Sequence, residues 1–288
     1  MTYQIENEND LIKALKECRD GDTIRFWPQT VITGFHIIDK SITIDGTCTI
    51  KTRDFVGAEK HRAAFTITKS ANIFGTYYGD MPEKPTDFRA DGLQTCFRAD
   101  GANYVDVFGA YVIGFNYMGV HLFDCTLAYF DSCHISDCAT PKEKYGFGYG
   151  IWQGGKGNAY NQVLNVNGCT FSDNRHCIAG SKHPNHIYVS DCDFHGGEFS
   201  QHLLDRHGDN QYGGGNYFII GNRFHAKDRF AYDLAKPDYF EDRHDLPVEI
   251  NQIRIEGNTF ARPFGMNGRI GSVMESEEIA NYKNNLYA

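Results

Sequence analysis

The chain has 288 residues, a formal net charge of −9, an aromatic content of 14% and 30 glycines. The acidic balance, without an evident basic face, argues against a nucleic-acid binder, and no apolar run reaches the length needed to span a membrane. Abundant glycine and aromatic residues in a polar chain are typical of a β-rich, turn-rich protein.

Residues 1–22 predict a short N-terminal cap built around one helix. Asn9 or Asp10 can cap this helix, and the Asp-Gly-Asp segment at 20–22 ends it. Its apolar stripe consists of Leu11, Ile12, Leu15 and Cys18. The segment has neither the basic start nor the apolar core of a signal peptide. We therefore expect an intracellular protein or the mature form of a secreted enzyme, which would be extracellular or periplasmic.

From residue 23 to residue 275 the chain repeats one pattern. It consists of an apolar residue, any residue, a small or turn residue, two residues of any kind and a second apolar residue. The intervals between copies run from 23 residues (Gly109 to Ser132) to 36 residues (Ser132 to Gly168). The small-residue position is occupied in turn by Gly46, Gly75, Gly109, Ser132, Gly168, Asp191, Gly221 and Gly257. Such regular repetition indicates a solenoid, in which each repeat forms one coil.

Aligning the copies places similar residues at equivalent positions. One position after the small residue the chain has Cys133, Cys169, Cys192, Asn222 and Asn258. Three positions after it are Val112, Ile135, Phe171, Phe194, Phe224 and Phe260. In a solenoid whose parallel strands stack about 4.8 Å apart, equivalent residues form vertical columns. We therefore expect a buried ladder of free thiols and carboxamides beside an apolar core stack; the nine cysteines follow no zinc-binding spacing.

These features predict an all-β, single-domain protein over residues 1–288. The predicted fold is a single-stranded right-handed parallel β-helix, a solenoid, with an N-terminal capping helix. Residues 1–22 form the cap and 23–275 form the coils. Residues 276–288 form a C-terminal cap or tail, which covers the pairing edge of the last coil.

The segment 171–209 concentrates the residues that a chemical site needs. It contains six of the twelve histidines, with arginines, a lysine and aspartates among them. Two consecutive coils end in similar charged segments, 174–176 (Asn-Arg-His) and 205–207 (Asp-Arg-His). Because side chains alternate along a strand, an inward Leu204 would put Asp205 and His207 on the outer face and Arg206 on the inner one.

The N-terminal helix DLIKALKEC, the following GDTIRF and the repeats resemble the parallel β-helix polysaccharide lyases of the pectate-lyase-like superfamily. The phrases NRHCIAG and LLDRHGD are similar to phrases in right-handed β-helix proteins that act on carbohydrate. The resemblance covers nearly the whole chain and implies a polysaccharide partner. A polygalacturonase set of separated aspartates and a pectate-lyase calcium cluster are not evident. We expect no cofactor, with calcium left open.

We expect a polysaccharide lyase that cleaves an acidic, uronic-acid-containing polymer by β-elimination. This reaction needs a cation to offset the sugar carboxylate, a base for the C5 proton and an acid for the leaving oxygen. The arginines or Lys182 would supply the cation, a histidine the base and a tyrosine the acid. The expected catalytic residues are His176, His207, Arg175, Arg206, Asp205 and Tyr149. The expected substrate-binding residues are His202, Lys182, Trp152 and Tyr145.

Two other functions fit the same segment. A glycoside hydrolase would use paired carboxylates from Asp173, Asp205 and Asp209. A carbohydrate-binding or adhesin coil without catalysis would have no need of clustered arginine, histidine and aspartate, which is why an enzyme is preferred. The oligomeric state is left open.

Two metal sites are weaker expectations. Zinc could bind histidines of this segment, namely His183 and His186 with His202 or His207. Calcium could bind acidic residues near the 235–248 insertion, namely Asp233, Asp238, Glu241 and Asp242. An acidic loop of this kind is more often simply solvated, so neither metal belongs to the expected site.

Overall fold

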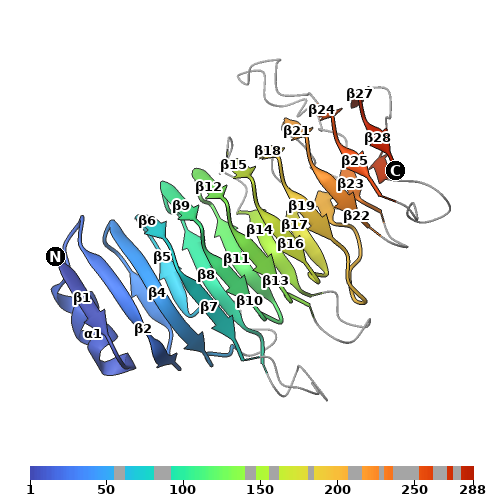
Figure 1. The fold of residues 1–288 in the computed structure, drawn as a ribbon. Helices are drawn as coiled ribbons and strands as arrows, with labels where there is room; N and C mark the ends of the chain where they lie inside the picture. The colour runs from blue at the N-terminus through green and yellow to red at the C-terminus, as the bar shows by residue number, and fades with distance from the viewer. Residues whose placement is uncertain are drawn as a thin grey trace.

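The computed structural model shows an elongated coil of parallel strands that begins beside an N-terminal helix (Figure 1). It describes residues 1–54, 62–80, 92–139, 147–155, 162–180, 185–206, 216–226, 230–235, 253–261, 271–274 and 280–288. The prediction of an all-β, right-handed parallel β-helix is confirmed. Across these ranges the named strands pair in parallel, and α1 (Glu8–Glu17) is the one helix.

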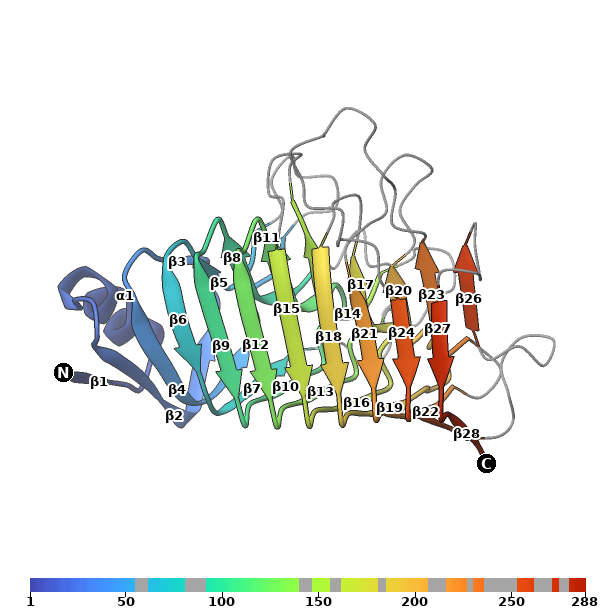
Figure 2. The same cartoon turned by 90° about the horizontal axis from the view of Figure 1, so that it is seen from above.

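The strands form three columns along the coil (Figure 2). The first column contains β1 (Thr2–Ile5), β2 (Thr23–Ile32), β4 (Ile42–Ile50), β6 (Ser70–Ile73), β9 (Tyr104–Phe108), β12 (Leu127–Asp131), β15 (Gln162–Asn167), β18 (Asn185–Ser190), β21 (Tyr217–Ile220), β24 (Ile253–Glu256) and β27 (Ala280–Lys283). The second contains β7 (Thr76–Gly79), β10 (Tyr111–Ile113), β13 (His134–Ser136), β16 (Thr170–Ser172), β19 (Asp193–His195), β22 (Arg223–His225), β25 (Thr259–Phe260) and β28 (Leu286–Tyr287).

The third column is a separate nine-stranded sheet. It contains β3 (His36–Ile38), β5 (Phe65–Ile67), β8 (Thr95–Asp100), β11 (Met118–Phe123), β14 (Tyr149–Gly154), β17 (His176–Gly180), β20 (Leu204–Arg206), β23 (Tyr232–Ala235) and β26 (Gly271–Met274). The first two columns belong to one sheet, because β4 pairs with β6 through its first half and with β7 through its second half.

The small residue of each repeat lies at the bend between the first and second columns. All eight predicted positions have a positive φ, from 53° at Asp191 to 98° at Gly46. Glycine adopts this left-handed conformation without a steric penalty, and a short polar side chain tolerates it. The small residue recurs in the sequence because each coil contains one such turn, and each turn needs a residue that tolerates a positive φ.

The predicted ladder of thiols and carboxamides is confirmed. The backbone N–H of Cys133 donates to Cys169 Sγ at 3.3 Å, and that of Cys169 donates to Cys192 Sγ at 3.4 Å. The column continues from the N–H of Cys192 to Asn222 Oδ1 and from that of Asn222 to Asn258 Oδ1, both at 2.9 Å. All nine cysteines are buried and free, as expected.

The predicted aromatic stack fills the core beside this ladder. Phe171 and Phe194 lie 5.0 Å apart between ring centroids with planes 6° apart, and Phe194 and Phe224 lie 4.9 Å apart at 6°. Phe260 extends the stack at 5.2 Å from Phe224. Each ring buries a large apolar surface, so the column contributes much of the hydrophobic stabilisation of these coils.

Helix α1 covers the N-terminal end of the coil. The side chain of Asn7 caps it by accepting from the backbone N–H of Asn9 at 3.0 Å and of Asp10 at 3.2 Å. The predicted cap at Asn9 or Asp10 is therefore wrong, because both residues lie in the first helical turn and supply the N–H groups that are capped. Leu11 and Ala14 are its buried residues. Among the described residues no helix has the length and apolarity to cross a membrane.

Strands β27 and β28 lie within the segment 276–288 that was predicted to be a tail. They pair in parallel with β24 and β25. These residues therefore extend the first and second columns and form part of the coil itself.

Candidate functional site

The third column carries a polar row on its outer face. Its inward residues are apolar and stack in register: Phe97, Val120, Ile151, Ile178 and Leu204. The residues that follow them point the other way and form the outer row: Arg98, His121, Trp152, Ala179 and Asp205. Asp233 continues this row as the register partner of Asp205. Leu204 faces inward and Asp205 outward, which is the arrangement that the sequence made conditional on an inward Leu204.

Four side chains meet near the C-terminal part of this row. His176 Nε2 lies 3.1 Å from Asp205 Oδ2. His202 Nδ1 lies 3.2 Å from Asp233 Oδ2 and 4.0 Å from Asp205 Oδ1. The His176 side chain is only 1% exposed, whereas that of His202 is 22% exposed. His202 is therefore the imidazole of the pair that a ligand can reach.

His176 is held at both ring nitrogens. Its Nδ1 lies 2.6 Å from the backbone oxygen of His202, and its Nε2 faces Asp205. Burial lowers the pKa of His176 to about 4 against the opposing effect of Asp205, so the ring is neutral at neutral pH. The short contact with the His202 oxygen therefore holds a neutral ring in place beside Asp205.

Tyr149 and Arg175 lie beside this cluster. The ring of Tyr149 stacks on that of His176, with centroids 5.6 Å apart and planes at 16°. Arg175 Nη1 lies 3.4 Å from the Tyr149 hydroxyl, and its Nη2 donates to Gln201 Oε1 at 2.7 Å. Desolvation by burial raises the pKa of Tyr149, and the nearby Arg175 offsets this only in part. A cation and a protonated phenol are thus held side by side.

The outer row continues toward the N-terminus with Trp152, His121 and Arg98. The rings of Trp152 and His121 make an edge contact with centroids 4.7 Å apart. Arg98 Nη1 lies 3.4 Å from His121 Nδ1, and the guanidinium lies 4.3 Å from the centroid of the Phe123 ring. The predicted stacking residue Trp152 is therefore on the same column as the cluster, on the coil of Tyr149.

Arg206 faces the inside of the coil. It is 4% exposed, its Nη1 lies 3.5 Å from the backbone oxygen of Gln153, and its guanidinium lies 5.9 Å from the Tyr217 ring centroid. Desolvation by burial lowers the pKa of this guanidinium. Arg206 alternates with the outward Asp205 along β20, so the predicted role of Arg206 in offsetting substrate charge does not fit its position.

The remaining predicted residues separate into two groups. Tyr145, Lys182, His207 and Asp209 lie outside the described residues. Asp173, proposed for a hydrolase, is exposed in the turn after β16, where its φ is 53°. It lies at the end of the second column, away from the strand that carries Asp205.

The predicted zinc set is divided between columns. His186 lies in β18 on the first column, where its Nδ1 accepts from the backbone N–H of Asn216 at 3.2 Å. His202 precedes β20 on the third column, so the coil separates the two. His183, the other member of the zinc set, lies outside the described residues. Of the calcium candidates, Asp233 belongs to the cluster beside His202, and the others lie outside the described residues: Asp238, Glu241 and Asp242.

Asp233, Gln201, His121 and Arg98 were missed by the sequence analysis as members of the site. An alignment of the segments 202–207 and 231–234 could have placed Asp233 beside Asp205. The same alignment extended back to β11 and β8 would have placed His121 and Arg98 in this row. Gln201 lies before β20 and had no positional signal.

Comparison with known proteins gives matches among solved structures, whereas no family model and no curated protein sequence matches. An alginate lyase from Paenibacillus sp. str. FPU-7 matches with a TM-score of 0.63 and 14% identity over 99% of this chain and 95% of that one. A mutant of the PL6 family alginate lyase AlyGC gives 0.57 and 12% identity over 100% of this chain and 39% of that one. At such identities the likeness shows the fold alone, a parallel β-helix.

Proposed function

We propose that the protein is a polysaccharide lyase that cleaves an acidic, uronic-acid-containing polysaccharide by β-elimination. The observation that carries the proposal is the group Tyr149, Arg175 and His202, which comes from three consecutive coils and lies beside one buried pair, His176 and Asp205. The fold shared with two alginate lyases supports it and makes alginate the first substrate to try.

Each step of the reaction has a candidate residue. Arg175 offsets the charge of the sugar carboxylate, which makes the C5 proton acidic. His202, partly exposed and oriented by Asp233, removes that proton. Tyr149 stays protonated at neutral pH and donates its proton to the leaving glycosidic oxygen. Trp152, which lies on the same strand as Tyr149, offers an aromatic ring on which a sugar ring of the substrate can stack.

The base is assigned to His202 in place of His176 because of burial. His176 is 1% exposed, its Nδ1 lies 2.6 Å from the backbone oxygen of His202 and its Nε2 lies 3.1 Å from Asp205, so it acts as a positioning residue for these two groups. His207, the other base in the original expectation, lies outside the described residues.

A glycoside hydrolase is the second candidate, and one observation favours it. Asp205 and Asp233 are register partners on β20 and β23, and both carboxylates face His202 Nδ1. Retaining glycosidases use two carboxyl groups about 5 Å apart. The hydrolase expected from the sequence used Asp173, Asp205 and Asp209; this second candidate keeps Asp205 and pairs it with Asp233.

The experiment that separates these functions uses a panel of uronic-acid polymers with alginate among them. Ultraviolet absorbance follows the conjugated double bond that elimination creates, and a reducing-end assay follows chain cleavage of any kind. A lyase gives both signals. Reducing ends without absorbance contradict the proposal in favour of the hydrolase, and the absence of both favours a binding coil. Parallel runs with added calcium and with a chelator test the expectation that no cofactor is needed.

Substitutions then test the assigned roles. We expect Tyr149→Phe and His202→Ala each to lower kcat at least about 100-fold, because each removes a proton-transfer group. The matched controls are Tyr129→Phe on the first column and His134→Ala on the second, which lie away from the site and should keep full activity. Full activity in both site variants, with the folds intact, would refute the assignment.

A further inference from the structure

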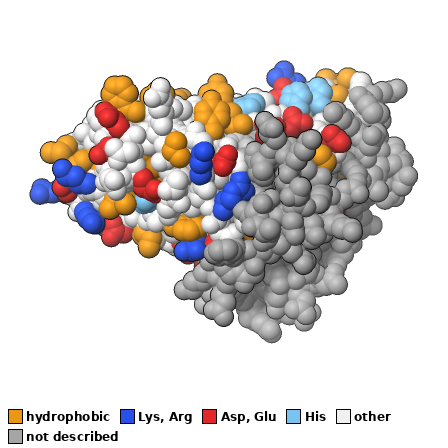
Figure 3. Space-filling view, turned by 90° about the horizontal axis from the view of Figure 1, so that it is seen from below, with side chains coloured by type: hydrophobic (Ala, Val, Ile, Leu, Met, Phe, Trp, Pro, Cys, Tyr) orange, Lys and Arg blue, Asp and Glu red, His pale blue; other side chains and the backbone are white. Residues whose placement is uncertain are grey.

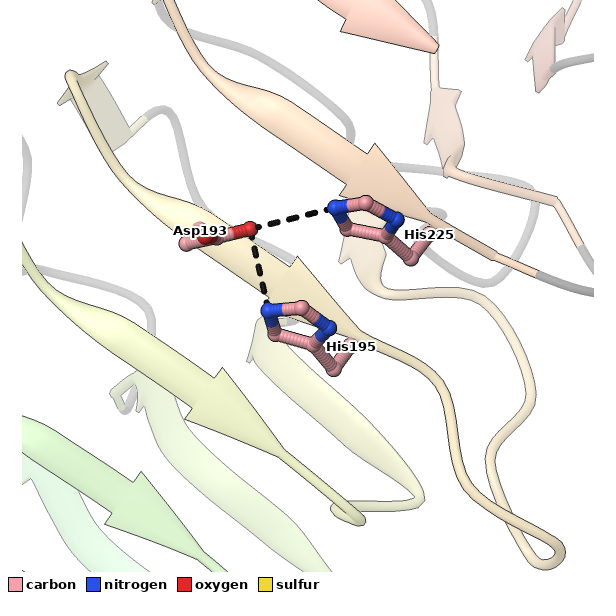
Figure 4. Close-up of side chains that lie close together, drawn as sticks. All are labelled: Asp193, His195 and His225. Atoms are coloured by element: carbon pink, nitrogen blue, oxygen red, sulfur yellow. Dashed lines mark ion pairs between the residues drawn. The ribbon is translucent and has the colours of Figure 1, made fainter. Parts of the chain in front are cut away.

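A second group of polar side chains lies on the outer face of the second column, on strands that carry none of the proposed catalytic residues. Asp193 and His195 are two residues apart on β19 and therefore share one face. His225 lies on β22 as the register partner of His195. Figure 4 shows both imidazoles directed at the carboxylate of Asp193. The two rings are stacked, with centroids 4.5 Å apart and planes at 4°.

The distances between the three ligand atoms fit a small metal ion. His195 Nε2 and His225 Nε2 lie 3.1 Å and 3.5 Å from Asp193 Oδ1, and all three atoms lie within 4.8 Å of one another. Ligands of a tetrahedral zinc ion with bonds of about 2.0 to 2.1 Å are separated by about 3.4 Å. The two ring planes are parallel, so each imidazole rotates about its Cβ–Cγ bond to direct its Nε2 lone pair at a shared ion.

The carboxylate is already oriented for this purpose. Arg223 is the register partner of Asp193, and its Nη2 lies 3.0 Å from Asp193 Oδ2. That contact holds one carboxylate oxygen and turns the other, Oδ1, toward the two imidazoles. Outer partners of this kind commonly fix the orientation of metal-ligating carboxylates.

We propose that Asp193, His195 and His225 form a binding site for a divalent transition-metal ion of the zinc class. Two imidazoles and one carboxylate oxygen are a ligand set that such ions prefer, and three protein ligands leave a fourth position for water or an incoming group. Both histidine side chains are near half exposed, at 45% and 43%, so the ion has access from solvent. Figure 3 shows histidines gathered beside acidic and basic side chains on the surface.

A bound ion would connect two coils. Two of its ligands come from β19 and one from β22, which pair in parallel at three register positions. An ion that binds the folded coil and not the unfolded chain raises the melting temperature, and above its Kd the stabilisation grows with the logarithm of the ion concentration. The site is independent of the proposed lyase activity, because its side chains lie on the second column and the catalytic ones on the third.

The test uses the full chain without an affinity tag and zinc chloride as the probe, in competition with a chromophoric chelator. We expect one zinc per chain in the wild type. His195→Ala and His225→Ala should each weaken zinc binding at least about tenfold. Loss of a residue that only orients a metal ligand already lowers metal affinity by about that factor, and loss of a ligand should cost more. His134→Ala is the control, since it removes an outward imidazole of the same column two coils away.

Cobalt substitution adds a second measurement. Cobalt bound by nitrogen and oxygen should give visible d–d absorption without thiolate charge-transfer bands, because all nine cysteines are buried in the core. Circular dichroism and the melting temperature check that the variants are folded. The proposal is overturned if the wild type binds no zinc, if binding is unchanged in both site variants, or if thiolate bands appear.

Discussion

A thiol and a carboxamide perform the same task in the ladder that begins at Cys133. Cys192, Asn222 and Asn258 each accept from a backbone N–H of the preceding coil and donate to a carbonyl oxygen of that coil. Cys133 Sγ donates to the oxygen of Val107 at 3.2 Å, and Asn222 Nδ2 donates to that of Val189 at 3.0 Å. The change from cysteine to asparagine along the chain therefore keeps the connection between coils, because both residues satisfy a buried donor and a buried acceptor at once.

This equivalence can be tested at Asn222, the first carboxamide of the ladder. Asn222→Ala leaves the N–H of Cys192 and the oxygen of Val189 without their partner, and should lower the free energy of unfolding by about 1 to 3 kcal/mol. Asn222→Cys should restore a substantial part of that loss. Urea unfolding of the three proteins measures the difference, and equal stability of the alanine and cysteine variants would contradict the equivalence.

The same scale shows what a single sequence can and cannot predict. The ladder was predictable because its members depend only on position in the repeat. The outward direction of Asp205 could be given only on the condition that Leu204 faces inward. The burial of His176 was not predictable, since its bonds come from His202 and Asp205 on the next coil. The alternation of side chains along the strand put Arg206 on the inner face if Leu204 faces inward. Its role was nevertheless predicted wrongly, because a buried arginine is rare and an exposed one was assumed.

At the scale of the element, each bend between the first and second columns has a residue in the left-handed backbone conformation. The bends differ in how closely the coils approach. At Gly75 (φ 97°) an added Cβ would collide with the backbone oxygen of Gly46 on the preceding coil. At Gly109 (φ 59°) an added Cβ would meet no atom within 4 Å. Glycine is therefore required for two different reasons at these bends: at Gly109 for the positive φ alone, and at Gly75 also for the close approach of the neighbouring coil.

Alanine at these two glycines should separate strain from collision. Gly109→Ala meets only the left-handed conformation, and should cost about 1 kcal/mol of unfolding free energy. Gly75→Ala must also push two coils apart, and should cost at least about 3 kcal/mol. Thermal or urea unfolding of both variants provides the comparison, and a Gly75→Ala protein as stable as Gly109→Ala would show that the coils near Gly46 yield without cost.

At the scale of the whole molecule, the coil is a stack in which each turn contacts mainly its neighbours, so its ends need protection. At the N-terminal end α1 supplies it through Glu8, whose carboxylate accepts from the backbone N–H of Gly34 at 2.5 Å and lies 2.8 Å from His36 Nε2. Thr33 Oγ1 also donates to it. The cap was predictable as a helix from its apolar stripe. Its attachment was not, because Glu8 meets residues more than twenty positions later in the chain.

The attachment of the cap predicts a specific pH dependence. Desolvation by burial raises the pKa of Glu8, but the hydrogen bonds from Thr33, His36 and Gly34 outweigh it, so the folded pKa lies below the ordinary value of 4.5. A carboxyl group with a depressed folded pKa stabilises the fold fully above its unfolded pKa and loses that contribution as the pH falls through the folded value. Glu8→Gln removes the contribution at every pH, and should cost about 1 to 2 kcal/mol at neutral pH.

The difference in unfolding free energy between the wild type and Glu8→Gln should therefore be largest at neutral pH and should shrink as the pH drops below 4.5. Urea titrations across this range measure it. Glu6→Gln is the matched control, because it removes the same charge from an exposed side chain two residues earlier and should leave the acid limb unchanged. A difference that stays constant with pH would mean that α1 is held by its apolar face alone, through Leu11 and Ala14, and that the carboxylate contacts at the first coil add nothing.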